Sequence, residues 1–373
     1  MSGSEAPREP VAADNGPAAA EGAAPAAEGA AAQERDRQPD MSLVHRLRQP
    51  KTLISLILPL VLLALFAKAL PGFELDKLPA KIAAANPLLL LAAFAIFYVG
   101  FPLRGYRWSL LLRQSGFGLK VRDATEIIFI SWLVNCLVPA KLGDVYRAWL
   151  LKINSTVSLS RTFGTVFIER VLDLFAIATL ALAAGFVSFR SGLPGDVQIV
   201  FAVGVVFLLL LAGALMTMRN FGRRIITKLP LPHRVLELYD RFEEGTFSSM
   251  RLMHLPRLVI LTGFIWATEA MRLYLVVQAF NLPGVHLGIS GAFFVALSGS
   301  LLTAVPLTPA GIGIVETGVV GLLTIVYGVA PNDALAITLV DRAISVLSII
   351  VLGSIAYAIS GKRRGAGVTA VPA

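Results

Sequence analysis

Long apolar stretches separated by short polar segments run through most of this chain. From residue 52 onward, runs of about 20 hydrophobic residues recur, which is the length that an α-helix needs to cross a membrane. The pattern predicts an all-α polytopic membrane protein. The expected full spans are residues 52–70, 87–108, 162–189, 197–218, 256–280 and 333–359.

Two further apolar stretches, 124–150 and 288–328, are interrupted by proline and glycine. The sequence Pro-Ala-Lys-Leu-Gly at 139–143 breaks the first, and Pro-Ala-Gly-Ile-Gly at 309–313 breaks the second. The 15 residues before the first break would make a helix of roughly 22 Å, shorter than a hydrocarbon core of about 30 Å. We therefore expect each stretch to form a re-entrant helical pair. Two full crossings in each stretch are the alternative.

The order of these elements repeats. Two spans, a broken pair and a third span make up residues 52–189, and the same order with inverted orientation makes up residues 197–359. Inverted repeats place a binding site near the middle of the bilayer, between the two halves. The sequence thus predicts six full spans and two re-entrant pairs in an inverted-topology repeat.

The distribution of Lys and Arg predicts the orientation. The expected external loops hold only Lys77, Lys81 and Arg190, and the other loops are rich in basic residues. Because basic residues gather in cytoplasmic loops, both termini are expected in the cytoplasm, and the protein in the plasma (inner) membrane. The expected cytoplasmic segments are 41–51, 104–123, 152–161, 219–257 and 362–364.

Composition agrees with a membrane protein and limits the other function classes. The 373 residues are 56% hydrophobic and only 15% charged, whereas soluble domains are nearer a quarter charged. The net charge of +9 lies in short loops between spans, so no nucleic-acid partner is expected. The single cysteine, Cys136, and four scattered histidines have no ligand spacing, so neither a metal nor a cofactor is expected.

The segments outside the spans differ in composition. Residues 1–40 are rich in Ala and Pro, hold eight acidic and three basic residues, and are expected to be disordered. Residues 41–51 form a basic juxtamembrane segment, 219–255 a cytoplasmic amphipathic loop, and 360–373 a basic cytoplasmic tail.

Charged residues within the apolar stretches are the candidate binding residues, because an ionisable group inside a membrane is costly unless it is paired or functional. A guanidinium binds phosphate with two parallel hydrogen bonds, and a helix restarting after a glycine adds free N–H groups. The predicted substrate-binding residues are Arg170, Arg342, Asn135, Pro139, Gly143, Arg147, Pro309, Gly311 and Gly313. The predicted orienting or coupling acids are Asp144, Glu169, Asp173, Glu316 and Asp341.

Other polar and aromatic residues are expected to have simpler roles. Glu269 and Arg272 are three residues apart and can form a structural salt bridge on one helix face. Lys141, together with Arg147, would make an electropositive entry from the cytoplasmic side. The four tryptophans are expected in interfacial belts or in helix packing.

Three strings, taken in order, resemble one family. They are Asn135-x-x-x-Pro139-x-x-x-Gly143-Asp144-x-x-Arg147, Glu169-Arg170-x-x-Asp173 and Pro309-Ala310-Gly311-Ile312-Gly313-x-x-Glu316. They resemble the transmembrane domain of lysylphosphatidylglycerol synthases, a flippase-like family of the UPF0104 type, over about residues 50–360. The family pattern at the second break is Pro-Gly-Gly-x-Gly, and Ala310 replaces its first Gly.

The resemblance implies lipid movement. In the two-domain enzymes of this family the membrane part resembles a flippase for aminoacylated phosphatidylglycerol, and other relatives are associated with polyprenyl-linked sugars or hopanoids. The soluble aminoacyl-transfer domain is not expected in this chain, so synthase activity is not expected. The favoured hypothesis is translocation of an anionic phospholipid or lipid-linked glycan. The alternatives are a non-catalytic partner of a synthase or glycosyltransferase, and a membrane-embedded headgroup transferase.

Overall fold

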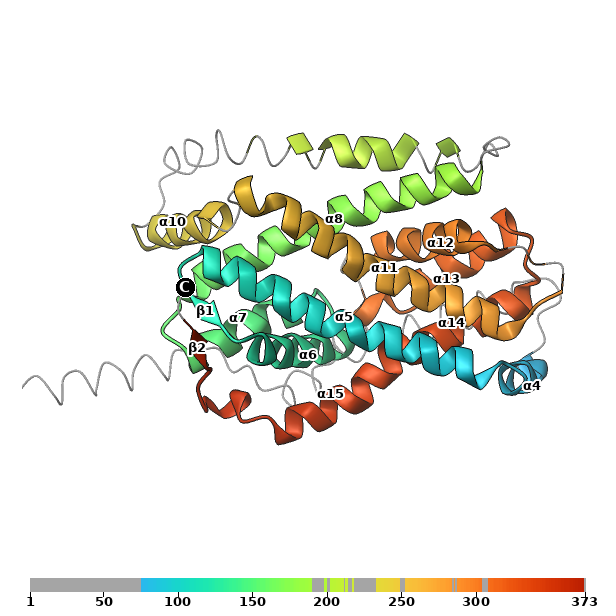
Figure 1. The fold of residues 1–373 in the computed structure, drawn as a ribbon, viewed down its shortest axis with the longest axis horizontal. Coiled ribbons are helices and arrows are strands. Elements are labelled where there is room, and N and C mark those ends of the chain that lie inside the picture. Colours follow the sequence, from blue (N-terminus) through green and yellow to red (C-terminus); the bar gives the residue numbers. More distant parts are fainter. Residues whose placement is uncertain are drawn as a thin grey trace, which may run out of the picture. The chain divides into compact units, whose positions relative to one another are not determined.

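Apolar helices make up nearly all of the described structure (Figure 1). The computed structural model describes residues 75–189, 198–199, 202–210, 212–213, 217, 233–248, 252–283, 285, 287–303 and 308–371. The expected tail 1–40, the segment 41–51 and the span 52–70 lie outside the described residues. The expected span 197–218 is described only in part, as helix.

The long helices match four of the expected spans. They are α5 (Pro87–Gln114), α8 (Leu159–Ser188), α11 (Leu255–Phe280), and the continuous pair α14 (Pro331–Arg342) and α15 (Ser348–Ile359), which a π-helical turn at Ala343–Leu347 joins. Together with Pro309–Val326, these make five stretches of the described residues that are long and apolar enough to cross a membrane. An all-α membrane protein is therefore confirmed.

Local sequence explains where the long helices begin. The Asn86 side chain accepts a hydrogen bond of 2.9 Å from the Leu88 N–H, and Pro87 occupies the first turn of α5, where its missing N–H costs nothing. Ser158 caps α8 in the same manner, accepting from the Arg161 N–H at 3.3 Å. These polar caps end the loops and start the apolar runs.

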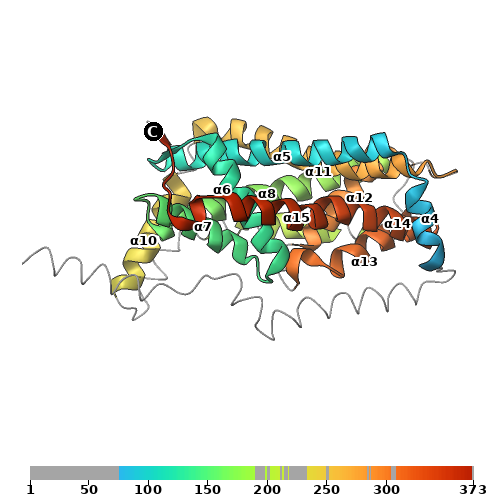
Figure 2. The same ribbon diagram turned by 90° about the horizontal axis from the view of Figure 1, so that it is seen from below.

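Two pairs of short helices lie between the long ones. The first pair is α6 (Val121–Leu137) and α7 (Leu142–Asn154). The second is α12 (Ile289–Leu302) and α13 (Ile314–Gly321), which a π-helical turn extends over Leu322–Val326. Figures 1 and 2 show the first pair toward the end that holds the C-terminus, and the second toward the opposite end, where α4 (Leu78–Ala83) lies.

Each short pair packs against a long helix of the other half of the chain. Helix α6 packs along α15, and α12 packs along α8, while α5 and α11 run side by side (Figures 1 and 2). The core formed by Ile177, Ala181, Ala270 and Leu297 joins α8, α11 and α12. Because each short pair packs against the other half, the two halves share one apolar interior.

The outer faces of the long helices are apolar as well. Leu88 and Val99 of α5, Phe264 of α11, and Ile355 and Ile359 of α15 are all exposed. Such faces on long helices are typical of contact with lipid tails, where no water is available to penalise them.

The helix of the expected span 87–108 is longer than the sequence predicts. Helix α5 continues to Gln114, and the Arg104 and Arg107 side chains within it are buried. The sequence reading ended the span at these charges because an unpaired arginine is unfavourable in a membrane. Both arginines have carboxylate partners on other helices, which removes that penalty.

Within the expected amphipathic loop 219–255, the described parts are helix α10 (His233–Ser248) and the short 3-10 turn Leu252–His254 that leads into α11. The apolar face of α10 contacts α8, where the Phe242 ring packs against Phe163 and Phe167. The two helices cross at glycines: an added Cβ on Gly164 would lie 2.5 Å from the Phe242 carbonyl oxygen, and one on Gly245 would lie 2.3 Å from the Arg161 carbonyl oxygen. Helix α10 therefore packs against α8 through close backbone contact.

The C-terminal segment folds back on the first short pair. Strand β2 (Ala370–Val371) pairs antiparallel with β1 (Gly118–Leu119), just before α6. The Asp123 carboxylate accepts a hydrogen bond of 2.7 Å from the Thr369 N–H and forms an ion pair of 3.0 Å with Lys362. Residues that the sequence predicts to be a tail are thus held at this end of the molecule.

Candidate functional site

The two Pro/Gly breaks form turns with the same unusual backbone. Ala140 and Lys141 in the first have φ values of 63° and 51°, and Ala310 and Gly311 in the second have 50° and 70°. Two consecutive residues are therefore left-handed, at the same distance after a proline, in both turns. Outside these turns, Asn281 is the only other non-glycine residue with positive φ in the described parts of the chain. Left-handed backbone costs a non-glycine residue about 1–2 kcal/mol, so packing must hold these turns in place.

The helix after each turn begins with a bonded rather than a free N–H. The Gly143 N–H donates to the Asn135 side-chain oxygen at 2.8 Å, and the Gly313 N–H donates to the Glu316 carboxylate at 2.6 Å. An added Cβ on Gly143 would lie 2.0 Å from the Ser131 carbonyl oxygen, so only glycine fits there. The N–H groups of the two glycines are therefore occupied by side chains and are not free donors.

An arginine from a later helix ties down each turn. Arg170 donates two hydrogen bonds to the Asp144 carboxylate, at 2.8 and 2.6 Å. Arg342 donates to Glu316 at 2.7 Å and to the Ala310 carbonyl oxygen at 2.6 Å. Carboxylate and arginine are 26 residues apart in both cases. In both halves, an arginine of a long helix thus holds a carboxylate at the start of the second short helix. We call this arginine–carboxylate contact the arginine lock.

Behind the first turn lies a buried cluster of ion pairs. Arg107 contacts the Asp173 carboxylate at 2.6 Å and the Glu169 carboxylate at 3.0 Å. Arg147 is 3.2 Å from Glu169, with its guanidinium 4.9 Å from the centre of the Trp108 ring. The predicted entry role of Arg147 is not supported by this position, because the side chain is buried behind the turn.

A second cluster joins the other half to α5. Arg272 donates two hydrogen bonds to Asp341, at 2.7 and 3.0 Å, and also pairs with Glu269. Arg104 of α5 reaches Glu269 at 2.7 Å. The Glu269–Arg272 pair is confirmed, and it is one part of a chain of ion pairs that runs across three helices.

A cavity of about 170 Å³ lies where the two turns meet. Of the predicted site residues, five line it: Asn135, Arg170, Gly311, Asp341 and Arg342. The other predicted residues do not line it. They form the turns or the ion pairs behind them: Pro139, Gly143, Asp144, Arg147, Glu169, Asp173, Pro309, Gly313 and Glu316.

Other residues line the cavity for which the sequence predicts different roles: Lys141 at a cytoplasmic entry and Arg272 in a structural salt bridge. Trp132 and Trp266, which had been expected in interfacial belts or in packing, line it as well. The Trp266 Nε1–H donates to Asp173 at 3.0 Å, and the Arg104 guanidinium lies 4.7 Å from the Trp132 ring centre. The spacing of charged residues in the sequence was the available signal for the arginines. Glu269 and Arg272 are three residues apart inside an apolar helix, as are Arg104 and Arg107, so each pair lies on one helix face.

The cavity combines a cationic lining with apolar walls. Four basic side chains and two acidic ones face the same space as apolar residues such as Leu273, Val315 and Val319. The basic residues are Lys141, Arg170, Arg272 and Arg342, and the acids are Glu269 and Asp341. Across the part of the chain that the structure describes, no group of three or more His, Cys, Asp or Glu side chains could hold a metal ion. The arrangement suits binding of an anionic group that carries apolar chains.

Comparison with known proteins gives the family. Residues 52–353 match the model of the lysylphosphatidylglycerol synthase TM region. A UPF0104 membrane protein of Methanocaldococcus jannaschii is 37% identical over 226 residues, which is 60% of this chain and 92% of that protein. A UPF0104 membrane protein of Methanothermobacter thermautotrophicus is 28% identical over 72% of this chain and 84% of its own length.

A further relative carries an additional region. The glycosyltransferase AglD of Haloferax volcanii is 28% identical over 321 residues, which is 76% of this chain but only 51% of that protein. The chain therefore spans about half the length of this relative. The match to the family model, over residues 52–353, includes both Pro/Gly turns and both arginine–carboxylate pairs that hold them. This multi-pass membrane protein belongs to the lysylphosphatidylglycerol synthase TM region family.

Proposed function

We propose that this protein moves an anionic phospholipid or a lipid-linked glycan across the bilayer, through the cavity between the two turns. One observation carries the proposal: two turns of the same backbone shape, each held by an arginine lock, meet at one cationic cavity. Paired, Gly/Pro-broken segments in two halves of a transporter mark its substrate site.

Helix length supports a re-entrant arrangement of α6 and α7 within an inverted repeat. Helix α6 has 17 residues and α7 has 13, so they measure about 25 and 20 Å, less than a core of about 30 Å. Helices α5 and α8, with 28 and 30 residues, are long enough to cross with tilt. Because the short pairs lie toward opposite ends of the described structure, each would enter from its own side of the membrane (Figure 2).

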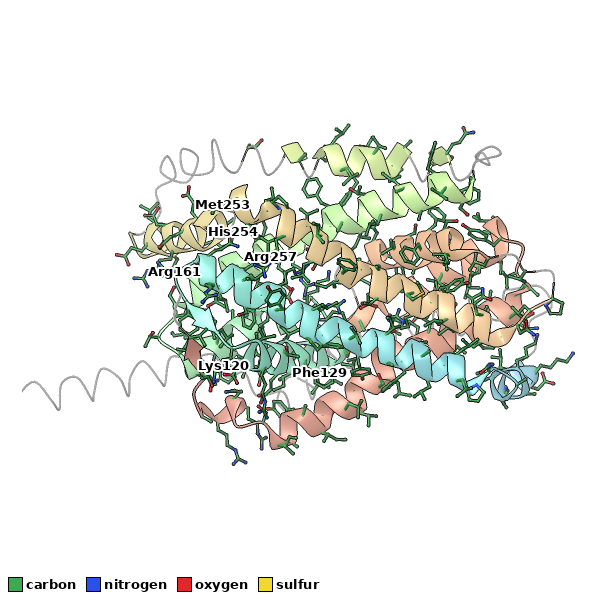
Figure 3. All side chains as sticks on the ribbon, in the orientation of Figure 1. Lys120, Phe129, Arg161, Met253, His254 and Arg257 are labelled. Carbon is green, nitrogen blue, oxygen red and sulfur yellow. The ribbon has the colours of Figure 1, made fainter. Side chains whose placement is uncertain are left out.

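Basic residues support a cytoplasmic location for the end that holds the C-terminus. Figure 3 shows Lys120, Arg161 and Arg257 toward this end. Basic residues flanking spans prefer the cytoplasmic side, and anionic lipids of that leaflet would strengthen the preference. In this orientation both termini are cytoplasmic, and the plasma membrane is the expected location.

The ion pairs suit a gated site. Arg170 and Arg342 hold the turns and raise the positive potential of the cavity, while Asp341 and the carboxylates behind it orient the arginines. Exchange of a carboxylate partner for a headgroup phosphate would loosen one turn at a time. Rocking between two halves could then open the cavity to each leaflet in turn.

The test is lipid movement in vesicles that contain the purified protein. Fluorescently labelled phosphatidylglycerol is followed by quenching the outer leaflet with dithionite, with and without a proton gradient. We expect transport by the wild type, and loss to the protein-free rate in Arg170→Gln and in Arg342→Gln. Arg161→Gln is the control, because Arg161 lies on the same helix as Arg170 but pairs with Glu244 outside the cavity. Unchanged transport in both variants would contradict the proposed site.

A second function has one supporting observation. The relative named a glycosyltransferase is about twice as long as the matched region, so its family domain works beside a further region. The chain could serve as a non-catalytic membrane partner of a synthase or glycosyltransferase. That function predicts stable co-purification with such an enzyme and no lipid movement by the protein alone. A headgroup transferase is less favoured, and it predicts product formation by the pure protein.

A further inference from the structure

The charged side chains of the cavity and the clusters behind it do not balance. Every arginine in this set has a carboxylate partner, and every carboxylate has an arginine. The arginines are Arg104, Arg107, Arg147, Arg170, Arg272 and Arg342. The acids are Asp144, Glu169, Asp173, Glu269, Glu316 and Asp341. Lys141 is the seventh cation, and among the described residues it forms neither an ion pair nor a side-chain hydrogen bond. The set therefore carries one uncompensated positive charge.

Lys141 occupies the point where the two halves of the repeat differ. It is the second left-handed residue of the first turn, and Gly311 takes that place in the second. Both residues line the cavity. Glycine adopts left-handed backbone without steric cost, so the turn itself gains nothing from lysine. An unpaired ammonium inside a membrane protein is costly, which indicates a role for its charge.

A second unpartnered group faces the same cavity from the opposite turn. The Thr308 hydroxyl is buried and has no hydrogen-bond partner among the described residues. Thr308 lines the cavity, directly before Pro309 of the second turn. A buried hydroxyl without a hydrogen-bond partner is unfavourable. An anionic oxygen in the cavity could accept a hydrogen bond from this hydroxyl.

We propose that Lys141 and Thr308 together bind one singly charged phosphate group, with Lys141 supplying the charge and Thr308 a hydrogen bond from the other half. This inference rests on the proposed lipid site and names the groups that take its ligand. The arginines then act as positioning residues that hold the two turns: Arg170 donates two hydrogen bonds to Asp144, and Arg342 donates one to Glu316 and one to the Ala310 carbonyl oxygen. A lysine is a compact point charge with three donors, so it can follow a phosphate as the turns move.

The experiment measures binding of short-chain probes to the purified protein in detergent. The probes are dihexanoyl phosphatidylglycerol, dihexanoyl phosphatidylcholine and dimethyl phosphate, and the signal is tryptophan fluorescence, since Trp132 and Trp266 line the cavity. In Lys141→Met we expect the Kd for phosphatidylglycerol to rise about tenfold or more, or at least 1.4 kcal/mol. Lys141→Arg should restore most of the affinity, and Thr308→Val should cause a smaller loss.

Two further variants keep the test decisive. Lys152→Met removes an exposed lysine of α7, the helix that follows Lys141, and should leave binding unchanged. Lys141→Gly gives the first turn the residue of the second, so it should fold well and still lose affinity. Lys141-dependent binding of dimethyl phosphate would identify the phosphate alone as the ligand group. Lys141-dependent binding of the lipid only would show that the acyl chains are also required, and it supports the same residues.

The outcomes separate the two proposals. If Lys141→Met and Lys141→Gly bind phosphatidylglycerol like the wild type, while Arg170→Gln and Arg342→Gln lose it, the role of Lys141 is overturned and the lipid site stands. If the wild type binds neither anionic lipid nor dimethyl phosphate, both proposals fail. If the Kd for phosphatidylcholine rises as much in Lys141→Met as the Kd for phosphatidylglycerol does, the result supports phosphate recognition, because both lipids carry the same phosphate.

Discussion

The two turns at the cavity are alike in backbone and different in chemistry. In both, two left-handed residues follow a proline, and an arginine 26 residues beyond a carboxylate holds the next helix. The first turn is capped by Asn135 from the preceding helix, and the second by Glu316 from the following one. The repeat thus preserves the shape of the turn and the position of the arginine. The residue that caps the helix differs between the halves, and the unpaired lysine is present only in the first turn.

The buried acids also differ in how many arginines depend on each of them alone. Glu169 contacts both Arg107 and Arg147, whereas Asp341 contacts Arg272, which keeps Glu269 as a second partner. Among the described residues, Glu169 is thus the only carboxylate partner of Arg147, as Glu269 is of Arg104 in the second cluster, whereas Arg272 has two carboxylate partners. This difference gives the largest expected effect of a single substitution.

Glu169→Gln should destabilise the protein by about 3–5 kcal/mol, because it leaves the buried Arg147 without an ion-pair partner. Asp341→Asn should cost less, since Arg272 retains Glu269. Thermal unfolding in detergent measures both. Glu244→Gln serves as the control, because the pair with Arg161 is exposed and should contribute less than about 1 kcal/mol. Equal losses in Glu169→Gln and Asp341→Asn would contradict the expected difference between these two carboxylates.

Gly143→Ala should cost about 1–3 kcal/mol, because the new Cβ would lie 2.0 Å from the Ser131 carbonyl oxygen and α6 or α7 would have to move. Gly321→Ala on α13 is the matched control. An added Cβ there meets nothing within 4 Å, so the change should be neutral or stabilising. The unfolding temperature of each variant is the measurement. A neutral Gly143→Ala would mean that the first turn is not closely packed against α6.

Lys141→Gly should have the smallest effect on stability, and in the opposite direction. It removes left-handed strain from a non-glycine residue, so we expect a gain of about 1 kcal/mol. Unfolding of this variant beside Lys141→Met separates strain from charge, because Met keeps the strain and removes the charge. A marked loss of stability in Lys141→Gly would show that the lysine side chain supports the turn.

Much of the site could be predicted from local sequence. The Pro/Gly breaks at 139–143 and 309–313 stand out inside apolar runs, and the membrane class follows from run length alone. Five of the predicted residues line the cavity. These features are readable because proline, glycine and charge inside apolar segments act on the chain locally.

The partners of those residues could not be read in the same manner. Arg170 has Asp173 one turn away on its own helix, yet its two short hydrogen bonds go to Asp144 of α7. Arg104 pairs across to Glu269, 165 residues later. Such contacts depend on which helices pack together, and each short pair packs against a long helix of the other half. The pairing of β2 with β1 was missed for the same reason.

The most direct test of the account asks whether a lipid headgroup enters the cavity. A photoreactive diazirine amino acid is placed at Ser300, which lines the cavity, and in a second variant at Ile355, which is exposed on the outer face of α15. After illumination in a membrane of mixed lipids, adducts are identified by mass spectrometry. The account predicts adducts enriched in anionic lipid at Ser300 and lost in Arg170→Gln, with bulk membrane composition at Ile355. Absence of lipid adducts at Ser300, or the same composition at both positions, would contradict it.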